Sequence, residues 1–87
     1  MTFDDEALAT AHRHSIRQRE EIIASGACGC FYCEAIVNPA EIRDWIDENR
    51  TALCPRCGVD ALIGDKSGFP ATNPAFLKAM HQHWFEG

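Results

Sequence analysis

Cys30-Phe31-Tyr32-Cys33 and Cys54-Pro55-Arg56-Cys57-Gly58 are the two stretches that decide the fold of this 87-residue chain. Each stretch contains a Cys-x-x-Cys pair, and residues 34–53 separate the two pairs. This spacing is typical of a zinc site with four thiolate ligands, because each pair turns its sulfurs toward one point while the intervening chain folds back. Pro55 presets a turn, and Gly58 permits a positive φ that directs backbone N–H groups at the thiolates. The sequence therefore predicts one Zn²⁺ ion bound by Cys30, Cys33, Cys54 and Cys57.

Cys28 is the cysteine left over, since the chain has five. A tetrahedral site needs only two sulfurs from this side, and the spacing selects Cys30 and Cys33. Cys28 is then a small buried residue or a free thiol. The alternative is that Cys28 replaces Cys30 as a ligand of the metal. We expect Phe31 and Tyr32, between the ligands, to shield the sulfurs from water. Iron is the alternative occupant of the site.

Length and composition predict one globular domain over residues 1–87, with 46% hydrophobic and 24% charged residues. So small a core gives only marginal stability on its own, whereas zinc–thiolate binding contributes on the order of 10 kcal/mol to the stability of a folded state. The chain has 8 Lys and Arg against 13 Asp and Glu, a formal charge of −5. This charge repels phosphate backbones and makes nucleic acid an unfavourable partner.

The location of the protein is predicted from its apolar runs and its cysteines. No apolar run is long enough to cross a membrane, and the first residues lack the basic start and apolar stretch of a secretion signal. An odd number of cysteines agrees with a reducing compartment, in which a bound metal rather than a disulfide cross-links the chain. We predict a cytoplasmic protein with no membrane partner, with a secreted disulfide framework as the alternative.

The first of three predicted helices spans residues 4–25, within a segment 1–26 that Gly26 ends. Its apolar stripe is narrow, which favours a helix that covers its own domain; packing against a second copy is the alternative. Asn38, Pro39 and Glu41 predict the start of a second helix, which ends near residues 48–49. Its apolar face comprises Ile42, Trp45 and Ile46.

The third predicted helix begins with Asn73 as cap and Pro74 at its first position, in the segment 71–87. Its apolar stripe predicts a core face made by Phe76, Leu77, Met80 and Trp84. Phe85 lies off this stripe, and an exposed Phe there indicates a contact surface.

The central segment, residues 27–70, is predicted to hold the metal centre, one helix and a β-hairpin. The hairpin strands are residues 51–54 and 59–63, on either side of the second cysteine pair. Residues 64–70 follow as a turn-rich loop, where Asp65, Lys66 and Ser67 are turn residues or, alternatively, a ligand site. The whole is a small α+β domain, about three helices around a zinc-knuckle hairpin.

Two histidine pairs, His12 with His14 and His81 with His83, lie on the predicted end helices. Helix residues two apart point in nearly opposite directions, so neither pair can chelate an ion by itself. We expect surface histidines; a second metal site, with one His from each pair, is the alternative.

Several of these stretches together resemble a group of small bacterial cytoplasmic proteins, and the resemblance runs from Ser25 onward. The residues that carry it are Cys28-Gly29-Cys30-Phe31-Tyr32-Cys33, residues 51–60, Gly64-Asp65, Ser67-Gly68-Phe69-Pro70 and Trp84-Phe85. The resemblance implies a zinc-ribbon-like or treble-clef-like centre, and it implies no reaction or partner.

Three functions are compatible with these predictions. The favoured one is a structural zinc domain that acts as a protein–protein interaction module, with a protein partner or as a homodimer, because four thiolates leave zinc no open position for catalysis. A nucleic-acid-binding zinc ribbon is the second, and its test is the effect of Arg13, Arg17 and Arg56 on salt-dependent binding. Thiol redox or metal sensing through Cys28 is the third. No catalytic constellation is recognised, so no enzymatic activity is predicted.

Overall fold

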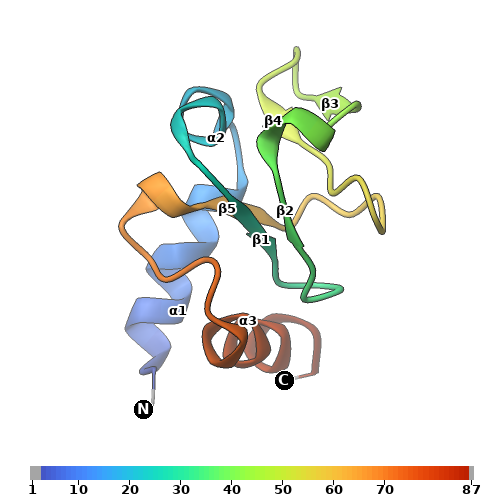
Figure 1. The fold of residues 1–87 in the computed structure, drawn as a ribbon. Coiled ribbons are helices and arrows are strands. Elements are labelled where there is room, and N and C mark those ends of the chain that lie inside the picture. The colour runs from blue at the N-terminus through green and yellow to red at the C-terminus, as the bar shows by residue number, and fades with distance from the viewer. Residues whose placement is uncertain (1–2, 87) are drawn as a thin grey trace.

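The computed structural model describes residues 3–86 (Figure 1). The α-helices are α1 (Asp5–His12), α2 (Arg19–Ala24) and α3 (Pro74–His81). The strands are β1 (Cys28–Cys30), β2 (Ile36–Val37), β3 (Trp45–Ile46), β4 (Thr51–Ala52) and β5 (Leu62–Gly64). Short 3-10 turns cover Arg13–Ser15, Pro39–Glu41 and Asp65–Ser67, and a π-helical turn at Gln82–Glu86 follows α3. The prediction of a small α+β fold with three helices is confirmed, although the first predicted helix is divided into α1 and α2 and the second predicted helix is not formed.

β1 is the middle strand of a three-stranded antiparallel sheet with the order β2-β1-β5. Cys28 lies opposite Val37 on one side and Gly64 on the other, and Cys30 lies opposite Leu62. β3 and β4 form a separate two-stranded antiparallel pair. All residues of β1 and β5 are buried, so the sheet is the centre of the molecule.

The predicted hairpin between residues 51–54 and 59–63 is wrong. Both segments contain a strand, but β4 pairs with β3, and β5 pairs with β1. The Cys54 N–H still donates to the Val59 carbonyl at 3.0 Å, after which the two segments separate. Pairing with β1 buries all three residues of β5 in the core, whereas β4 has only two residues with which to form a hairpin.

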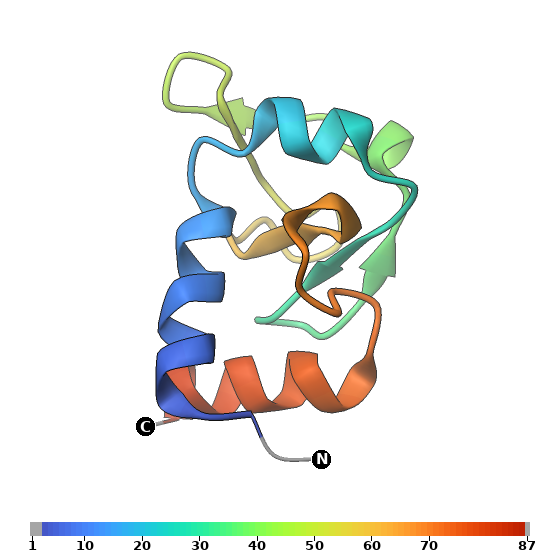
Figure 2. The ribbon, with the colours of Figure 1, turned by 90° about the vertical axis from the view of Figure 1, so that its left-hand side faces the viewer.

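α1 and α3 lie at one end of the molecule, α2 lies at the other, and the sheet lies between them (Figures 1 and 2). Phe3 and Phe76 pack edge to face, with ring centroids 5.3 Å apart. The Trp84 indole N–H donates to the Leu8 carbonyl at 3.3 Å, which joins the two terminal helices. The helices contribute to one buried core through Leu8, Ala11, Ile22, Phe76, Leu77 and Met80.

The single helix predicted over residues 4–25 is wrong, because the chain leaves helical geometry between α1 and α2. Ile16 is extended, and Arg17 has a φ of 50°, in the left-handed region. Gln18, which follows, is buried at 4% exposure. Local sequence contains no proline or glycine to cause this break, so its cause is tertiary.

The break places the Gln18 amide between two strands that do not pair with each other. Its Nε2 group donates to the Leu62 carbonyl at 3.0 Å, and its Oε1 atom accepts from the Ala52 N–H at 3.2 Å. The Arg17 N–H donates to the Thr51 hydroxyl oxygen at 2.8 Å. Buried backbone groups need such partners, and an unbroken helix would have used the Arg17 N–H for its own hydrogen bond.

The second predicted helix, from Asn38 to residues 48–49, is also wrong. Its capping box is present: the Asn38 side chain accepts from the Ala40 N–H, and the Glu41 carboxylate accepts from the Asn38 N–H at 2.8 Å. The chain makes only one 3-10 turn before Ile42 becomes extended. Trp45 then pairs in β3, and the Arg19 guanidinium stacks on its ring at 4.5 Å. A cap contributes about 1 kcal/mol, which this pairing and stacking outweigh.

The third predicted helix is confirmed as α3, which begins with the Asn73 side chain accepting from the Ala75 N–H. Phe76, Leu77 and Met80 are fully buried, as the stripe predicts, whereas Trp84 is 38% exposed. α1 buries Leu8 and Ala11 within its own chain, as expected of a cover helix. Among residues 3–86, no helix has the length and apolar character needed to span a membrane.

Candidate metal centre

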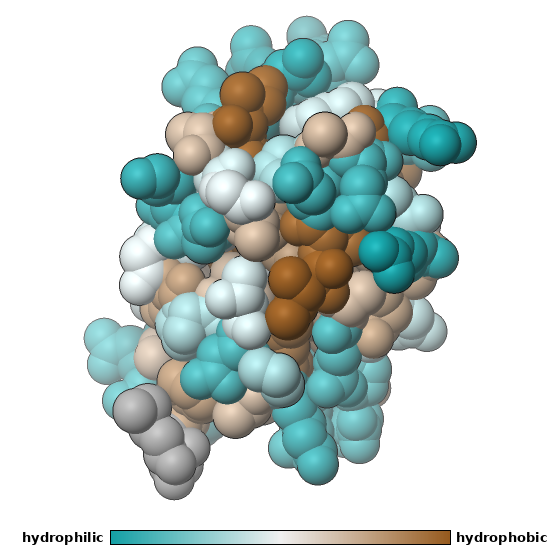
Figure 3. All heavy atoms as spheres, in the orientation of Figure 1, coloured by the Kyte–Doolittle hydropathy of each residue, from teal (hydrophilic) through white to brown (hydrophobic). Residues whose placement is uncertain are grey.

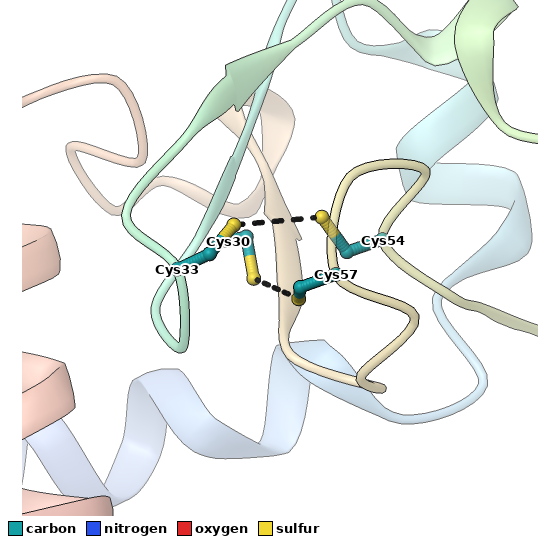
Figure 4. Close-up of side chains that lie close together, drawn as sticks. All are labelled: Cys30, Cys33, Cys54 and Cys57. Carbon is teal, nitrogen blue, oxygen red and sulfur yellow. Dashed lines mark hydrogen bonds between the residues drawn. The ribbon is translucent and has the colours of Figure 1, made fainter.

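Four cysteine sulfurs from two distant turns meet beside the sheet (Figure 4). The sulfurs of Cys30 and Cys57 are 3.7 Å apart, those of Cys33 and Cys54 are 3.8 Å apart, and all four lie within 4.8 Å of one another. A tetrahedral site with Zn–S bonds of about 2.3 Å has sulfur–sulfur edges of about 3.8 Å. A disulfide needs about 2 Å. The four sulfurs therefore fit one metal ion and are not joined as disulfides.

The two turns have the same backbone construction. We call residues 30–34 the inner knuckle and residues 54–58 the outer knuckle. In each, the N–H of the first cysteine donates to the carbonyl five residues later: Cys30 to Ala35 at 2.9 Å, and Cys54 to Val59 at 3.0 Å. In each, the last residue has a positive φ, 64° at Glu34 and 80° at Gly58. The positive φ predicted for Gly58 is confirmed. The same conformation at Glu34 was not predicted, because a glutamate rarely adopts a positive φ.

Burial and backbone N–H groups act in opposite directions on the thiols. Burial alone raises the pKa of Cys54, but hydrogen bonds from the N–H groups of Arg56 and Cys57 outweigh it and lower that pKa. The Arg56 N–H lies 3.4 Å from the Cys54 sulfur, as predicted for this turn. At Cys30 burial prevails and raises the pKa. A buried sulfur of this kind becomes a stable thiolate only next to a cation, which agrees with a metal-binding role.

The cluster is partly covered by the protein. Cys30 and Cys54 are buried, whereas Cys33 and Cys57 lie nearer the surface. Phe31 is 1% exposed and Tyr32 is 43% exposed. Of the two aromatic residues expected to shield the sulfurs, only Phe31 is therefore removed from solvent.

Cys28 is not a member of the sulfur cluster. It is fully buried in β1, and burial, followed by the negative charge of Asp65, raises its pKa to about 11. A thiol with this pKa is protonated near neutral pH and is a poor nucleophile. This environment agrees with a small buried residue and weighs against redox chemistry at Cys28.

The histidines that could have formed a second metal site have other neighbours. The His14 ring lies 2.9 Å from the Glu21 carboxylate, His81 lies 3.1 Å from Glu86, and the His12 ring packs on Trp84 at 4.1 Å. Within residues 3–86, the cysteine cluster is the one group of three or more His, Cys, Asp or Glu close enough to share an ion. No second site is therefore assembled in the described chain.

Asp65, which opens the loop after β5, has a structural role. Its carboxylate accepts from the N–H groups of Gly26 at 3.2 Å and Ala27 at 3.0 Å. The Ser67 hydroxyl accepts from the Phe69 N–H at 3.1 Å. These contacts support the turn interpretation of residues 64–70, because they fasten the loop to the segment that leads into β1.

Comparison of the chain with protein-family models, curated proteins and solved structures found no match. The resemblance to a group of bacterial proteins thus remains a prediction.

Proposed function

We propose that the chain is a zinc-stapled domain in which one Zn²⁺ ion, bound by Cys30, Cys33, Cys54 and Cys57, has a structural role. The observation that supports this is the distance between the sulfurs, which matches the edge of a zinc–thiolate tetrahedron. Four thiolates complete the coordination of zinc and leave no position for water or substrate. The ion then joins the two turns that begin at Cys30 and Cys54.

Elemental analysis of protein purified without chelator tests the metal and its ligands. Each of the four cysteines is changed to serine in turn, and Cys28→Ser is the matched control because Cys28 is outside the cluster. We expect about one zinc per chain in the wild type and in the control, and a loss of zinc in each ligand variant. Metal retained in a ligand variant, or lost in the control, contradicts the assignment; iron in place of zinc corrects the metal alone.

We further propose that the domain contacts a protein partner through an aromatic surface, defined as Tyr32, Trp84 and Phe85. These side chains are 43%, 38% and 43% exposed. Tyr32 and Phe85 meet edge to face with ring centroids 4.9 Å apart, which joins the inner knuckle to the π-helical turn after α3. Exposed aromatic residues are enriched at protein interfaces. The face drawn in Figure 3 is mainly hydrophilic, with only small hydrophobic patches.

The aromatic surface is tested with the double variant Tyr32→Ser, Phe85→Ser. The control is Ile23→Ser, which removes a residue that is 60% exposed on α2, at the other end of the molecule. Molar mass by light scattering and pull-down from cell extract are measured for each metal-loaded protein. We expect a complex or dimer that the double variant loses and the control keeps. A monomer without a reproducible partner contradicts the interaction role and leaves the metal assignment intact.

A further inference from the structure

A groove with a volume of about 840 Å³ lies beside the break between α1 and α2. It is bounded on one side by this break and on the other by the turn that joins β3 to β4, two segments that lie next to each other in Figure 2. Four arginines line this space: Arg13, Arg17, Arg19 and Arg50. We call the space and these four residues the arginine groove. They are half of the 8 Lys and Arg residues of the chain.

No guanidinium group of the groove forms an ion pair with a carboxylate of residues 3–86. Among the ion pairs within residues 3–86, Arg56 with Glu41 is the one that involves an arginine. Glu21 lines the same groove, but its carboxylate is 2.9 Å from the His14 ring. All four arginines are exposed, so an anion from solution can reach their guanidinium groups.

Arg19 is held in place by three contacts. Its Nη1 group donates to the Asn49 carbonyl at 3.0 Å, and its guanidinium lies 4.5 Å from the centre of the Trp45 ring. Its backbone N–H donates to the Arg50 carbonyl at 3.0 Å. A guanidinium that is already oriented loses little conformational entropy when it binds an anion.

Backbone strain is concentrated at the two sides of the groove. Asp47, Glu48 and Asn49 have successive φ values of 54°, 59° and 66°, and Arg17 has a φ of 50°. Non-glycine residues in this region are strained, and the surrounding structure must hold them there. Two hydrogen bonds hold the strained segments in place: the Arg17 N–H donates to Thr51, and the Arg19 N–H donates to Arg50. The same bonds bring the arginines of the two segments together.

We propose that the arginine groove binds a small phosphorylated ligand, a phosphate monoester or a pyrophosphate group. The planar guanidinium group donates two parallel hydrogen bonds to two phosphate oxygens. Several arginines attract a doubly charged phosphate more strongly than a single carboxylate. Glu20, Glu21 and Glu48 line the same groove, and the chain carries a net charge of −5. These charges repel a long nucleic-acid backbone more than a compact anion. The proposal is independent of the metal centre and of the aromatic surface.

The test is calorimetric titration of the metal-loaded protein at low salt with pyrophosphate, a nucleoside 5′-monophosphate, the unphosphorylated nucleoside and a single-stranded oligonucleotide. The groove variant is Arg17→Gln, Arg50→Gln. The control, Arg43→Gln, Arg56→Gln, removes the same charge from residues that do not line the groove. We expect saturable binding of the phosphorylated probes below about 1 mM, at least about tenfold weaker in the groove variant and within about twofold of wild type in the control.

Amide chemical shifts of the wild-type protein provide a second readout, which is independent of how the variants fold. We expect pyrophosphate to shift resonances of residues 13–21 and 48–50. The absence of saturable phosphate binding, an equal loss in both variants, or shifts located elsewhere overturns the proposal. Tighter binding of the oligonucleotide than of pyrophosphate also overturns it, in favour of nucleic acid as the ligand.

Discussion

The inner and outer knuckles share a cysteine spacing and a backbone hydrogen bond, yet they sit in different surroundings. The inner knuckle begins in β1, the central strand, and its Cys30 and Phe31 are at most 1% exposed. In the outer knuckle Pro55 and Arg56 are exposed, and Cys57 is half-buried. The inner knuckle is therefore anchored in the core by Cys30 and Phe31, whereas the outer knuckle is a loop attached to the core through one buried residue, Cys54. The core should hold the first in position, whereas the second depends on the metal.

Metal removal should have the largest effect and should separate the two knuckles. Zinc–thiolate binding contributes on the order of 10 kcal/mol, comparable with the whole stability of a domain. We expect chelator to unfold the middle of the chain, with the amides of Cys54 and Gly58 losing exchange protection before that of Cys30, which lies in a paired strand. Hydrogen exchange followed by NMR during chelator titration measures this order. Simultaneous or reversed loss would remove the distinction between core and attached loop.

Phe31→Ala and Pro55→Ala change equivalent positions, the first residue after the first cysteine of each knuckle. Phe31 is 1% exposed, so its truncation should cost about 3–5 kcal/mol of unfolding free energy. Pro55 is exposed, so its replacement should cost less than about 1 kcal/mol. Denaturant unfolding of the metal-loaded variants checks the pair. Costs within about 1 kcal/mol of each other would contradict the difference in burial.

Substitutions at the last residue of each knuckle should change the stability of the protein in opposite directions. A Cβ added at Gly58 meets no atom within 4 Å, so Gly58→Ala tests only its φ of +80°, and we expect a loss of about 1–2 kcal/mol. Glu34 already has a φ of 64°, so Glu34→Gly should relieve strain and stabilise the protein by less than about 1 kcal/mol. Thermal unfolding with bound metal compares them. A loss of stability in Glu34→Gly would show that this side chain makes contacts that offset its strain.

The smallest expected effect concerns the ion pair between Arg56 of the outer knuckle and Glu41, at 3.2 Å. The Asn38 N–H, and then Arg56, lower the pKa of Glu41. Its contribution to stability is therefore complete above the ordinary glutamate pKa and is lost as the pH falls through the lowered value. NMR titration of Arg56→Ala should show the Glu41 pKa raised toward, but not to, its ordinary value, because the Asn38 N–H remains. An unchanged pKa would mean that the ion pair does not contribute in solution.

Local signals predicted the ends of some elements but not their extent. Asn73 caps α3 and Asn38 forms its capping box with Glu41, as predicted, whereas Asp4, predicted as the first residue of the helix, caps α1. A cap is an interaction within a few residues and contributes only about 1 kcal/mol, so it starts a turn without guaranteeing that a helix continues. After Glu41 the helix stops, because Trp45 gains a strand partner and a stacked arginine from distant segments.

The sequence by itself determined the pairing of two Cys-x-x-Cys turns, the turn geometry at Gly58 and the apolar face of α3, because each depends on spacing or on one residue's own conformational preference. Only the tertiary structure decided the break at Gln18, the partners of β4 and β5, and the gathering of Arg50 with three arginines from the first segment. Gly29 belongs to the same group, since any Cβ there would collide with the Ala71 carbonyl oxygen. These features satisfy backbone groups and fill space between residues far apart in the chain, and no local pattern encodes such contacts.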